Sequence, residues 1–479
     1  YEDLGEWEKA HHVYKKLNDN EVIAQMIERA STSMLQGALL TVESWLNDLP
    51  PSLLRNRPGL LSIRGVIAYM KGNLREGLNL LTQAEQSFRQ INEQTGLILT
   101  LLRRATAHRF LGDYDASLRD ADEVIQLVEA DDDHQLYYAE ALRVKGLALY
   151  RLGQARQSLN FFESSLNLYV RLNRTANIPV LLMETGMVYQ AIGSYAESGV
   201  ANEKALQIWR KEGNLSWQAN LLNNLGVLRH IQGEYEKAAL AFEEGLVCAR
   251  RSGYARMEAL IAIGLGDLST ELEDFNVAQL NYRHAEEIVR EMDDRFLLFY
   301  LAMAQSILML LQKRITEVRE LIAQVRSGDS LYEKGLLNFV LGRLSLADGD
   351  ASQSIHELEE AERCFLEDGR RMECDSSRIW LMAARHQTKD DMAVRKIMAN
   401  VFGGRGQIAH GILVTAHQAR SWLNGLQKDA EAGRMAGDLL MRASRVAAKM
   451  PAIRRNLHRM SHVVQIPNPH LIIRAFGKS

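Results

Sequence analysis

Apolar and polar residues along this chain follow the spacing of amphipathic α-helices, and short polar turns separate the helical stretches. In the clearest segment, residues 220–242, Leu221, Leu225 and Leu228 recur at intervals of three to four residues and fall on one helix face. The turn Gly233-Glu234-Tyr235 follows, and a second stretch of helical spacing begins after it. The pattern therefore predicts a helix, a tight turn and a second helix.

This turn recurs along the chain at a nearly constant interval. Each copy has a Gly or its substitute, a polar residue and then an aromatic or apolar residue. The successive spacings are 40, 41, 40, 40, 40, 40, 36 and 41 residues. The copies begin at Gly72, Gly112, Gly153, Gly193, Gly233, Glu273, Lys313, Gly349 and Asp390. Such a register predicts an array of stacked helix pairs that share a continuous core.

Small residues mark the expected contact between the two helices of each pair. One set lies seven residues before each turn: Ala105, Gly146, Gly186, Gly226, Gly266, Ser306 and Gly342. A larger side chain at these positions would hold the two helix axes apart. The glycine of the turn itself supplies the permissive backbone of a helix C-cap.

Residues 220–242 resemble the tetratricopeptide repeat consensus. The consensus residues appear in order as Gly226, Gly233, Tyr235, Ala238 and Phe242. The resemblance extends over about residues 60–391 and implies an all-α, right-handed superhelical solenoid of about ten helix pairs. The period of about 40 residues exceeds the family's usual length of about 34, so either longer helices or longer connections are expected.

The markers predict four regions along the chain. Residues 1–59 form N-terminal helical repeats and a proline-containing bridge, and residues 60–400 form the regular array. Residues 401–462 are expected to be helices that cap the array. Residues 463–479 are expected to be a linker and the start of a further domain, because Pro467 and Pro469 break the helical pattern and a strand-like segment follows.

Composition narrows the class of protein. A chain of 479 residues exceeds one globular core, and its 47% hydrophobic and 24% charged residues are typical of a cytoplasmic protein without a membrane span. The net charge of −3 gives no footprint for direct nucleic-acid binding by the repeats, although residues 431–479 hold nine Lys/Arg against two Asp/Glu. Three cysteines without metal-ligand spacing favour a reducing compartment.

No catalytic or cofactor motif can be assembled from the residues. Gly403-Gly404-Arg405-Gly406 lacks the Gly-Lys-Ser/Thr ending of a phosphate loop and is interpreted as a loop between helices. His410 and His417 could share a helix face, but a metal would need further ligands. We therefore expect a protein that is not an enzyme, with no cofactor and no metal in this fragment.

The candidate binding residues are polar positions on the first helix of each pair, which lines the concave face in tetratricopeptide arrays. Counting from the small-residue markers gives Arg109, Glu140, Arg143, Tyr150, Gln190, Asn220, Asn223, His230, Asp267, Thr270 and Arg343. Planar donors and acceptors with an aromatic side chain suit a small-molecule inducer, or a peptide or protein segment. The alternative is that this face is polar only because water fills it.

Two edges of the array resemble a family of regulators. Residues 45–61, from Trp45 to Leu61, are similar to the segment that opens the repeats of bacterial large ATP-binding transcription activators of the maltose-regulon group. There, Pro50, Pro51 and Pro58 would fix an extended bridge. Residues 470–477 resemble the first strand of the winged helix in Streptomyces-antibiotic-regulatory-type activators.

This resemblance implies that the fragment is the sensor region of such an activator. Its partners would then be an inducer and, in the full-length chain, its own signal-transduction ATPase module and DNA-binding domain. The leading hypothesis is a ligand- or partner-binding sensor of a cytoplasmic transcription regulator. The alternatives are a protein-interaction scaffold that binds a peptide or partner helix, and a helical enzyme. The inducer's identity and self-association stay open.

Overall fold

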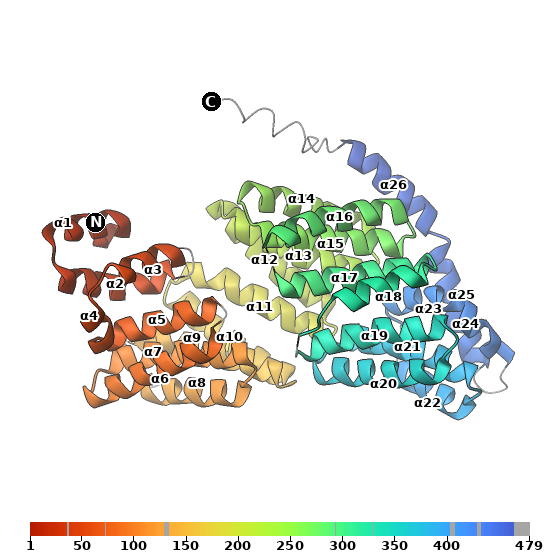
Figure 1. The fold of residues 1–479 in the computed structure, drawn as a ribbon, viewed down its shortest axis with the longest axis horizontal. Coiled ribbons are helices and arrows are strands. Elements are labelled where there is room, and N and C mark those ends of the chain that lie inside the picture. Colours follow the sequence, from red (N-terminus) through yellow and green to blue (C-terminus); the bar gives the residue numbers. More distant parts are fainter. Residues whose placement is uncertain are drawn as a thin grey trace. The chain divides into compact units, whose positions relative to one another are not determined.

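The structure is a computed structural model of the chain (Figure 1). It describes residues 1–35, 38–71, 73–128, 134–292, 294–328, 330–402, 408–428 and 433–463. Every regular element in these ranges is a helix. The predicted all-α fold class, a helical-repeat solenoid, is confirmed, because paired helices follow one another through these ranges. The Gly403–Gly406 loop and the strand expected at residues 470–477 lie outside the described residues.

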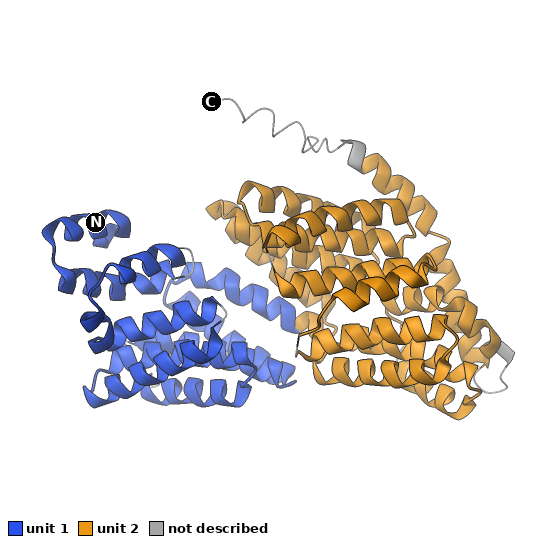
Figure 2. Cartoon of the chain, viewed as in Figure 1, with its two compact units in different colours: residues 1–188 blue, residues 189–479 orange. Residues whose placement is uncertain are grey.

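The chain divides into two compact units, Tyr1–Val188 and Tyr189–Ser479 (Figure 2). This boundary falls inside the segment 60–400, at a place that no sequence marker identifies. Among the described residues, the 3-10 helices Glu2–Leu4 and Thr175–Asn177 belong to unit 1. The α-helices up to the boundary are α1 (Trp7–Leu17), α2 (Asn20–Met34), α3 (Leu39–Asn47), α4 (Pro51–Asn56), α5 (Pro58–Met70), α6 (Leu74–Gln90), α7 (Gln94–Leu111), α8 (Tyr114–Val128), α9 (Gln135–Arg151), α10 (Ala155–Arg171) and α11 (Ile178–Ala191), within which the boundary lies.

Unit 2 continues the same alternation of paired helices. Its pairs are followed by shorter helices and by a 3-10 helix, Asn424–Lys428. Its elements are α12 (Tyr195–Glu212), α13 (Leu215–Ile231), α14 (Tyr235–Arg251), α15 (Ala255–Glu271), α16 (Phe275–Met292), α17 (Arg295–Leu311), α18 (Ile315–Gln324), α19 (Leu331–Ala347), α20 (Ala351–Glu367), α21 (Arg371–Gln387), α22 (Asp391–Phe402), α23 (His410–Gln418), α24 (Arg420–Leu423), α25 (Gly433–Ala447) and α26 (Met450–Val463).

The 40-residue period comes from long helices joined by short turns. Helices α13, α14 and α15 each have 17 residues. Both turns of a repeat contain a residue of positive φ, as at Gly213 (φ 69°), Gly233 (φ 77°) and Gly253 (φ 67°). Each half-repeat is therefore about 20 residues long, and longer helices, rather than longer connections, explain the long period.

Non-glycine residues occupy the same turn position in later repeats. Glu273, Lys313 and Lys389 have φ values of 59°, 62° and 59°. The last of these corrects the sequence register, because the turn residue is Lys389 and not Asp390. With this shift the final spacing of the array becomes 40 residues, in line with the others.

The small residues before each turn permit close helix packing, as predicted. A Cβ at Gly226 would lie 2.5 Å from Cε1 of Phe242, and a Cβ at Gly266 would lie 2.3 Å from Cε1 of Tyr282. Phe242 and Tyr282 come from the second helices of these pairs and are fully buried. Glycine is therefore needed here because an aromatic ring fills the space of a side chain.

The proline-containing segment near the N-terminus differs from the extended bridge that was expected. Pro51 and Pro58 each start a helix, α4 and α5, because a proline in the first turn loses no helical hydrogen bond. Trp45 is buried as an anchor and stacks on the ring of His11 at a centroid distance of 4.6 Å.

The C-terminal helices of unit 2 return to its earlier repeats. Helix α26 packs against α14. Arg454 Nη1 donates to the backbone oxygen of Glu273 at 3.0 Å, and His458 Nε2 lies 2.5 Å from an Asp274 carboxylate oxygen. His417 of α23 pairs with the Glu273 side chain at 3.3 Å. The segment after α22 is thus fastened to the turn between α15 and α16.

Candidate ligand-binding site

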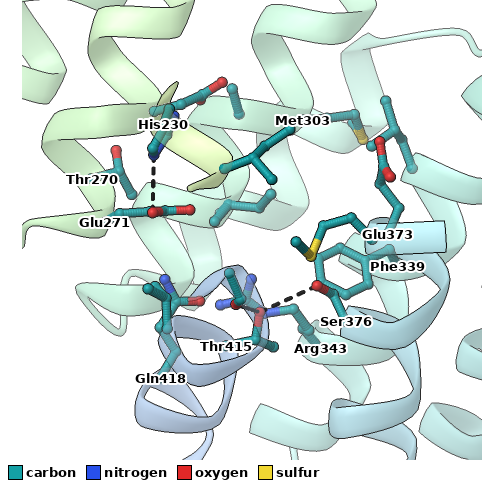
Figure 3. Close-up of a pocket in the computed structure, with 18 of the residues that line it drawn as sticks. His230, Thr270, Glu271, Met303, Phe339, Arg343, Glu373, Ser376, Thr415 and Gln418 are labelled. Carbon is teal, nitrogen blue, oxygen red and sulfur yellow. Dashed lines mark hydrogen bonds and ion pairs between the residues drawn. The ribbon is translucent and has the colours of Figure 1, made fainter. Parts of the chain in front are cut away.

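Unit 2 contains a cavity of about 320 Å³ (Figure 3). Its walls come from the first helices of successive pairs, α13, α15, α17, α19 and α21. Tyr282 of α16 and Phe365 of α20 add two aromatic rings, and α23 lines a further side. The cavity is therefore bounded both by the repeats and by the segment that returns to them.

The apolar wall follows directly from helical spacing. On α19, Tyr332, Leu336, Phe339 and Arg343 are spaced by four, three and four residues and all line the cavity. Such residues share one helix face. Helix α17 presents a similar face through Tyr300, Met303, Ala304 and Ile307. A mainly apolar wall with a few polar groups is the usual composition of a small-molecule site.

One polar cluster lies at the α13–α15 side of the cavity. His230 Nε2 lies 2.9 Å from a Glu271 carboxylate oxygen. Burial disfavours both charged forms, but the mutual attraction outweighs it, so the pKa of His230 is raised and the pKa of Glu271 is lowered. Tyr282 Oη donates to Asp267 at 2.7 Å, and burial raises the pKa of Asp267 to about 6. Both carboxylates of the cluster, Glu271 and Asp267, therefore have a partner within it.

This polar cluster is connected to α23 through Tyr235. The Tyr235 hydroxyl donates to Glu271 at 3.3 Å and lies 2.9 Å from His410 Nε2. His410 is the first residue of α23, and burial lowers the pKa of its ring. The position of α23 is therefore linked by hydrogen bonds to a residue that lines the cavity.

The charge of Arg343 has no counter-charge. The side chain is 5% exposed, and its guanidinium lies over the ring of Trp380 at 4.4 Å and over the ring of Phe339 at 5.5 Å. Within the described part of the chain it makes no hydrogen bond or ion pair, and its buried Nε has no partner. Burial lowers the pKa of Arg343 to about 9. In Figure 3 the side chain extends toward the end of the cavity where Ser376 and Thr415 lie.

Glu373, a second charged residue that lines the cavity, has an ion-pair partner. It lies 3.5 Å from Arg370, whose guanidinium is 3.7 Å above the ring of Tyr332. The Ser376 and Thr415 hydroxyls are 3.2 Å apart and join α21 to α23. Arg343 is thus the one charged cavity-lining side chain, among the residues described, that has no polar partner.

The structure brings four of the residues predicted from the sequence into this cavity. They are His230, Asp267, Thr270 and Arg343. Gln190 on α11 and Asn220 and Asn223 on α13 are partly buried and lie outside the cavity lining. Whether any of these residues binds a ligand stays a prediction.

The predicted residues of unit 1 form a separate arrangement. Arg143 donates to Glu140 and to Glu184, each at 2.5 Å, and Tyr169 Oη donates to Glu140 at 2.6 Å. Burial opposes ionisation of Glu140, but Arg143 outweighs it and lowers the pKa of that carboxyl. Arg143 is therefore satisfied within the protein. The other two predicted residues of unit 1, Arg109 and Tyr150, are partly buried. The Arg109 guanidinium lies 4.6 Å from the centroid of the Phe110 ring, and the Arg151 guanidinium lies 5.7 Å from the centroid of the Tyr150 ring.

Sequence reasoning missed most of the aromatic lining and all of α23. The faces of α17 and α19 could have been found from their spacing, because Tyr300, Tyr332 and Phe339 follow the same register as the polar candidates. Tyr282 and Phe365 come from second helices, where the sequence register predicts no binding positions. No local signal predicts Thr415, since its place depends on where α23 returns.

The described residues hold no group of three or more His, Cys, Asp or Glu side chains suited to a metal ion. Among the same residues, no helix is both long enough and apolar enough to cross a membrane.

The contact between α23 and the turn after α13 can be tested by substitution of Gly233. A Cβ at Gly233 would lie 2.5 Å from His410 Nδ1, whereas a Cβ at Gly193, in the equivalent turn with φ 81°, has nothing within 4 Å. Gly193→Ala is expected to lower the free energy of unfolding by about 1–2 kcal/mol through backbone strain alone. Gly233→Ala should lose a further ~1–2 kcal/mol by displacing His410.

Hydrogen exchange distinguishes these two variants. Faster exchange of residues 410–418 is expected in Gly233→Ala and not in Gly193→Ala. Equal exchange of this helix in both variants would contradict the contact between Gly233 and His410.

One family model supports the helical-repeat fold. The tetratricopeptide repeat family matches residues 96–169 and 178–251, which coincide closely with α7–α10 and α11–α14. No curated protein matches the sequence.

Several solved structures are similar to this chain. A Rap protein complexed with competence and sporulation factor is 12% identical, with a TM-score of 0.48 over 78% of this chain and 99% of that one. The Rap conjugation gene regulator of plasmid pLS20, in complex with the Phr* peptide, is 15% identical, with a TM-score of 0.45 over 76% and 96%. A tetratricopeptide repeat protein from Parabacteroides merdae is 16% identical, with a TM-score of 0.41 over 56% and 93%.

Proposed function

We propose that this chain is a non-catalytic sensor in which unit 2 binds a small molecule in its cavity. The observation that carries the proposal is the composition of the cavity wall. It combines an apolar, aromatic surface with one buried cation, Arg343, that has no polar partner in the described residues. A site with these features and this volume is the usual form of a small-molecule pocket.

The second part of the proposal is that α23 reports whether the cavity is occupied. Gly411, Val414, Thr415 and Gln418 of this helix line the cavity, opposite residues of the repeats. A ligand that contacts both sides binds more tightly when α23 is in place, and it therefore shifts the population toward that state. Helix α23 is connected through α25 to α26, so occupancy would also affect the C-terminal end of unit 2.

A thermal-shift screen of small metabolites tests the binding function. A ligand specific for the folded state raises the Tm by mass action, by an amount that grows with its concentration. Ala304→Phe serves as the matched variant, since Ala304 lines the cavity and is 6% exposed. Shifts that occur in the wild type and are lost in Ala304→Phe support the site. Ligands that shift both proteins equally bind elsewhere, and a screen with only such ligands contradicts the proposal.

We place this sensor in a cytoplasmic transcription regulator. The support is the resemblance of residues 45–61 to the segment that precedes the repeats of large ATP-binding activators. Its partners would then be its own ATPase module and DNA-binding domain. The parent gene is the test: coding sequence for a phosphate-binding loop upstream and a winged helix downstream supports the assignment, and a gene with neither contradicts it.

A second candidate function, a protein-interaction scaffold, is favoured by one feature of unit 1. Apolar side chains are exposed at the ends of α5, α7 and α9, where Met70, Phe110 and Leu152 are 47%, 55% and 37% exposed. Exposed apolar groups at successive repeats suit an extended peptide. Peptides selected on this protein should then bind Phe110→Ser at least about tenfold more weakly. The control, Leu280→Ser, changes an exposed residue of α16 and should retain binding.

A further inference from the structure

We infer that the ligand of the unit 2 cavity is an organic carboxylate with an apolar or aromatic body, and that its carboxylate binds Arg343. This inference rests on the proposed function and specifies the chemistry of its ligand. It combines three observations: the buried Nε of Arg343 without a partner, a neutral polar pair at the same end of the cavity (Figure 3), and an aromatic wall along the cavity.

The first observation is the unmet hydrogen-bonding capacity of Arg343. A guanidinium has five N–H donors, and burial without partners is costly for a charged group. The rings of Trp380 and Phe339 stabilise the charge through their faces, but they accept no conventional hydrogen bond. An incoming anion would supply the missing acceptors, and a planar carboxylate matches the guanidinium through two parallel bonds.

No carboxylate of the cavity already fills this role. Glu271 is paired with His230, Asp267 accepts a bond from Tyr282, and Glu373 lies beside Arg370. Burial alone accounts for the lowered pKa of Arg343, with no contribution from a nearby acidic group. No described residue therefore supplies a counter-charge to Arg343.

Charge balance favours a carboxylate over a phosphate. Arg343 offers one positive charge, and Ser376 and Thr415 add only neutral hydroxyls. A phosphate monoester would bring a charge of about −1.5 to −2 into a cavity that already holds three carboxyl groups, so part of that charge would be left unpaired. A single carboxylate neutralises Arg343 without excess.

The body of the ligand is defined by the aromatic wall. The rings of Tyr300 and Tyr332 are 6.4 Å apart, and those of Tyr332 and Phe365 are 6.3 Å apart, in tilted arrangements that suit contact with a further ring. Met303 and Met372 complete the surface with adaptable side chains. The cavity of about 320 Å³ lies at the lower end of the range of about 300–1,000 Å³ found for small-molecule sites, so it suits a small ligand.

Isothermal titration of the full chain with matched acids and amides tests the inference. The probes are phenylacetate and 3-phenylpropionate, their neutral amides, and phenyl phosphate. The acids should bind about 30-fold or more tightly than the amides, because one charge-assisted pair is lost in the neutral compounds. The same loss is expected for the acids with Arg343→Met, while Arg343→Lys should retain part of the binding. Arg283→Met, which removes an exposed cation of α16, should bind as the wild type does.

The outcomes separate the ligand class from the binding function. Failure of both acids to bind at millimolar concentration overturns the inference. Binding of phenyl phosphate more tightly than either acid overturns it as well. Neutral ligands that bind the wild type, are lost in Ala304→Phe and are unaffected by Arg343→Met would overturn the inference while the sensor function stands. If no ligand depends on Ala304, both proposals fail.

A further arm distinguishes the source of the carboxylate. A short peptide ending in Phe is compared as the free acid and as the C-terminal amide. The inference expects the small acids to compete with the free-acid peptide. Binding of the peptide acid without any binding of the small acids would identify a chain end as the ligand and overturn the assignment to a small molecule.

Discussion

Replacing Gly266 by alanine is expected to lower the free energy of unfolding of unit 2 by about 2–4 kcal/mol. The new Cβ would lie 2.3 Å from Cε1 of Tyr282, a ring that is fully buried. The ring has little room to move, because its hydroxyl is held by Asp267 at 2.7 Å and by Thr270 at 3.1 Å. The gain in helix propensity from Gly to Ala is about 1 kcal/mol and does not offset this collision.

Gly437→Ala is the matched control. Gly437 also lies within a helix, α25, but a Cβ there meets nothing within 4 Å. Alanine should therefore leave stability unchanged or raise it by up to about 1 kcal/mol. Hydrogen exchange of α15–α16 during urea unfolding measures the effect locally. An equal loss of unfolding free energy in Gly266→Ala and Gly437→Ala would contradict the expected collision with Tyr282.

Arg343→Met is expected to stabilise the ligand-free protein by about 2–4 kcal/mol. The wild-type Arg343 is 5% exposed and its buried Nε has no partner, and replacing such a charge by an apolar side chain of similar volume removes its desolvation penalty. Methionine keeps the contact with the rings of Trp380 and Phe339. A buried charge that is kept for ligand binding in this way lowers the stability of the ligand-free protein.

The difference in stability between Arg343→Met and the wild type is expected to depend on pH. The folded-state pKa of Arg343 is lowered to about 9, below its ordinary value of 12.5, so the unfolded chain binds more protons above pH 9. The wild type therefore gains stability relative to Arg343→Met as the pH rises through 9. Denaturation of both proteins at pH 7 and pH 10 measures this effect, and the advantage of Arg343→Met in free energy of unfolding should be smaller at pH 10. Arg283→Met should change stability by less than about 0.5 kcal/mol, and a destabilised Arg343→Met would contradict the account.

The repeat fold could be predicted from the sequence because its signals are local. The turn glycines and the small packing residues recur in a fixed register, and the ring that each small residue admits, as at Gly226 and Phe242, lies within the same helix pair. The error at Asp390 arose where the turn has no glycine. Lys389 takes the left-handed conformation there, and nothing in its residue type marks it.

The candidate site could be predicted only in part. Register identified the inward face of α13, α15 and α19, and so it found His230, Asp267 and Arg343. It could not show that Asn220 and Asn223 lie outside the cavity, since the extent of the cavity depends on α21 and α23. In unit 1 the same register identified Arg143 but not Glu184. Glu184 lies on α11, in the next helix pair, and forms an ion pair with Arg143.

Hydrogen exchange of α23 with and without a cavity ligand tests the central claim most directly, because that claim couples ligand binding to a helix that lines the site. With a saturating ligand, exchange of residues 410–418 in the wild type should slow by about tenfold or more. Ala304→Phe should show no change under the same conditions. Unchanged exchange of α23 in the wild type, at a ligand concentration that raises its Tm, would contradict the coupling of the cavity to the C-terminal helices.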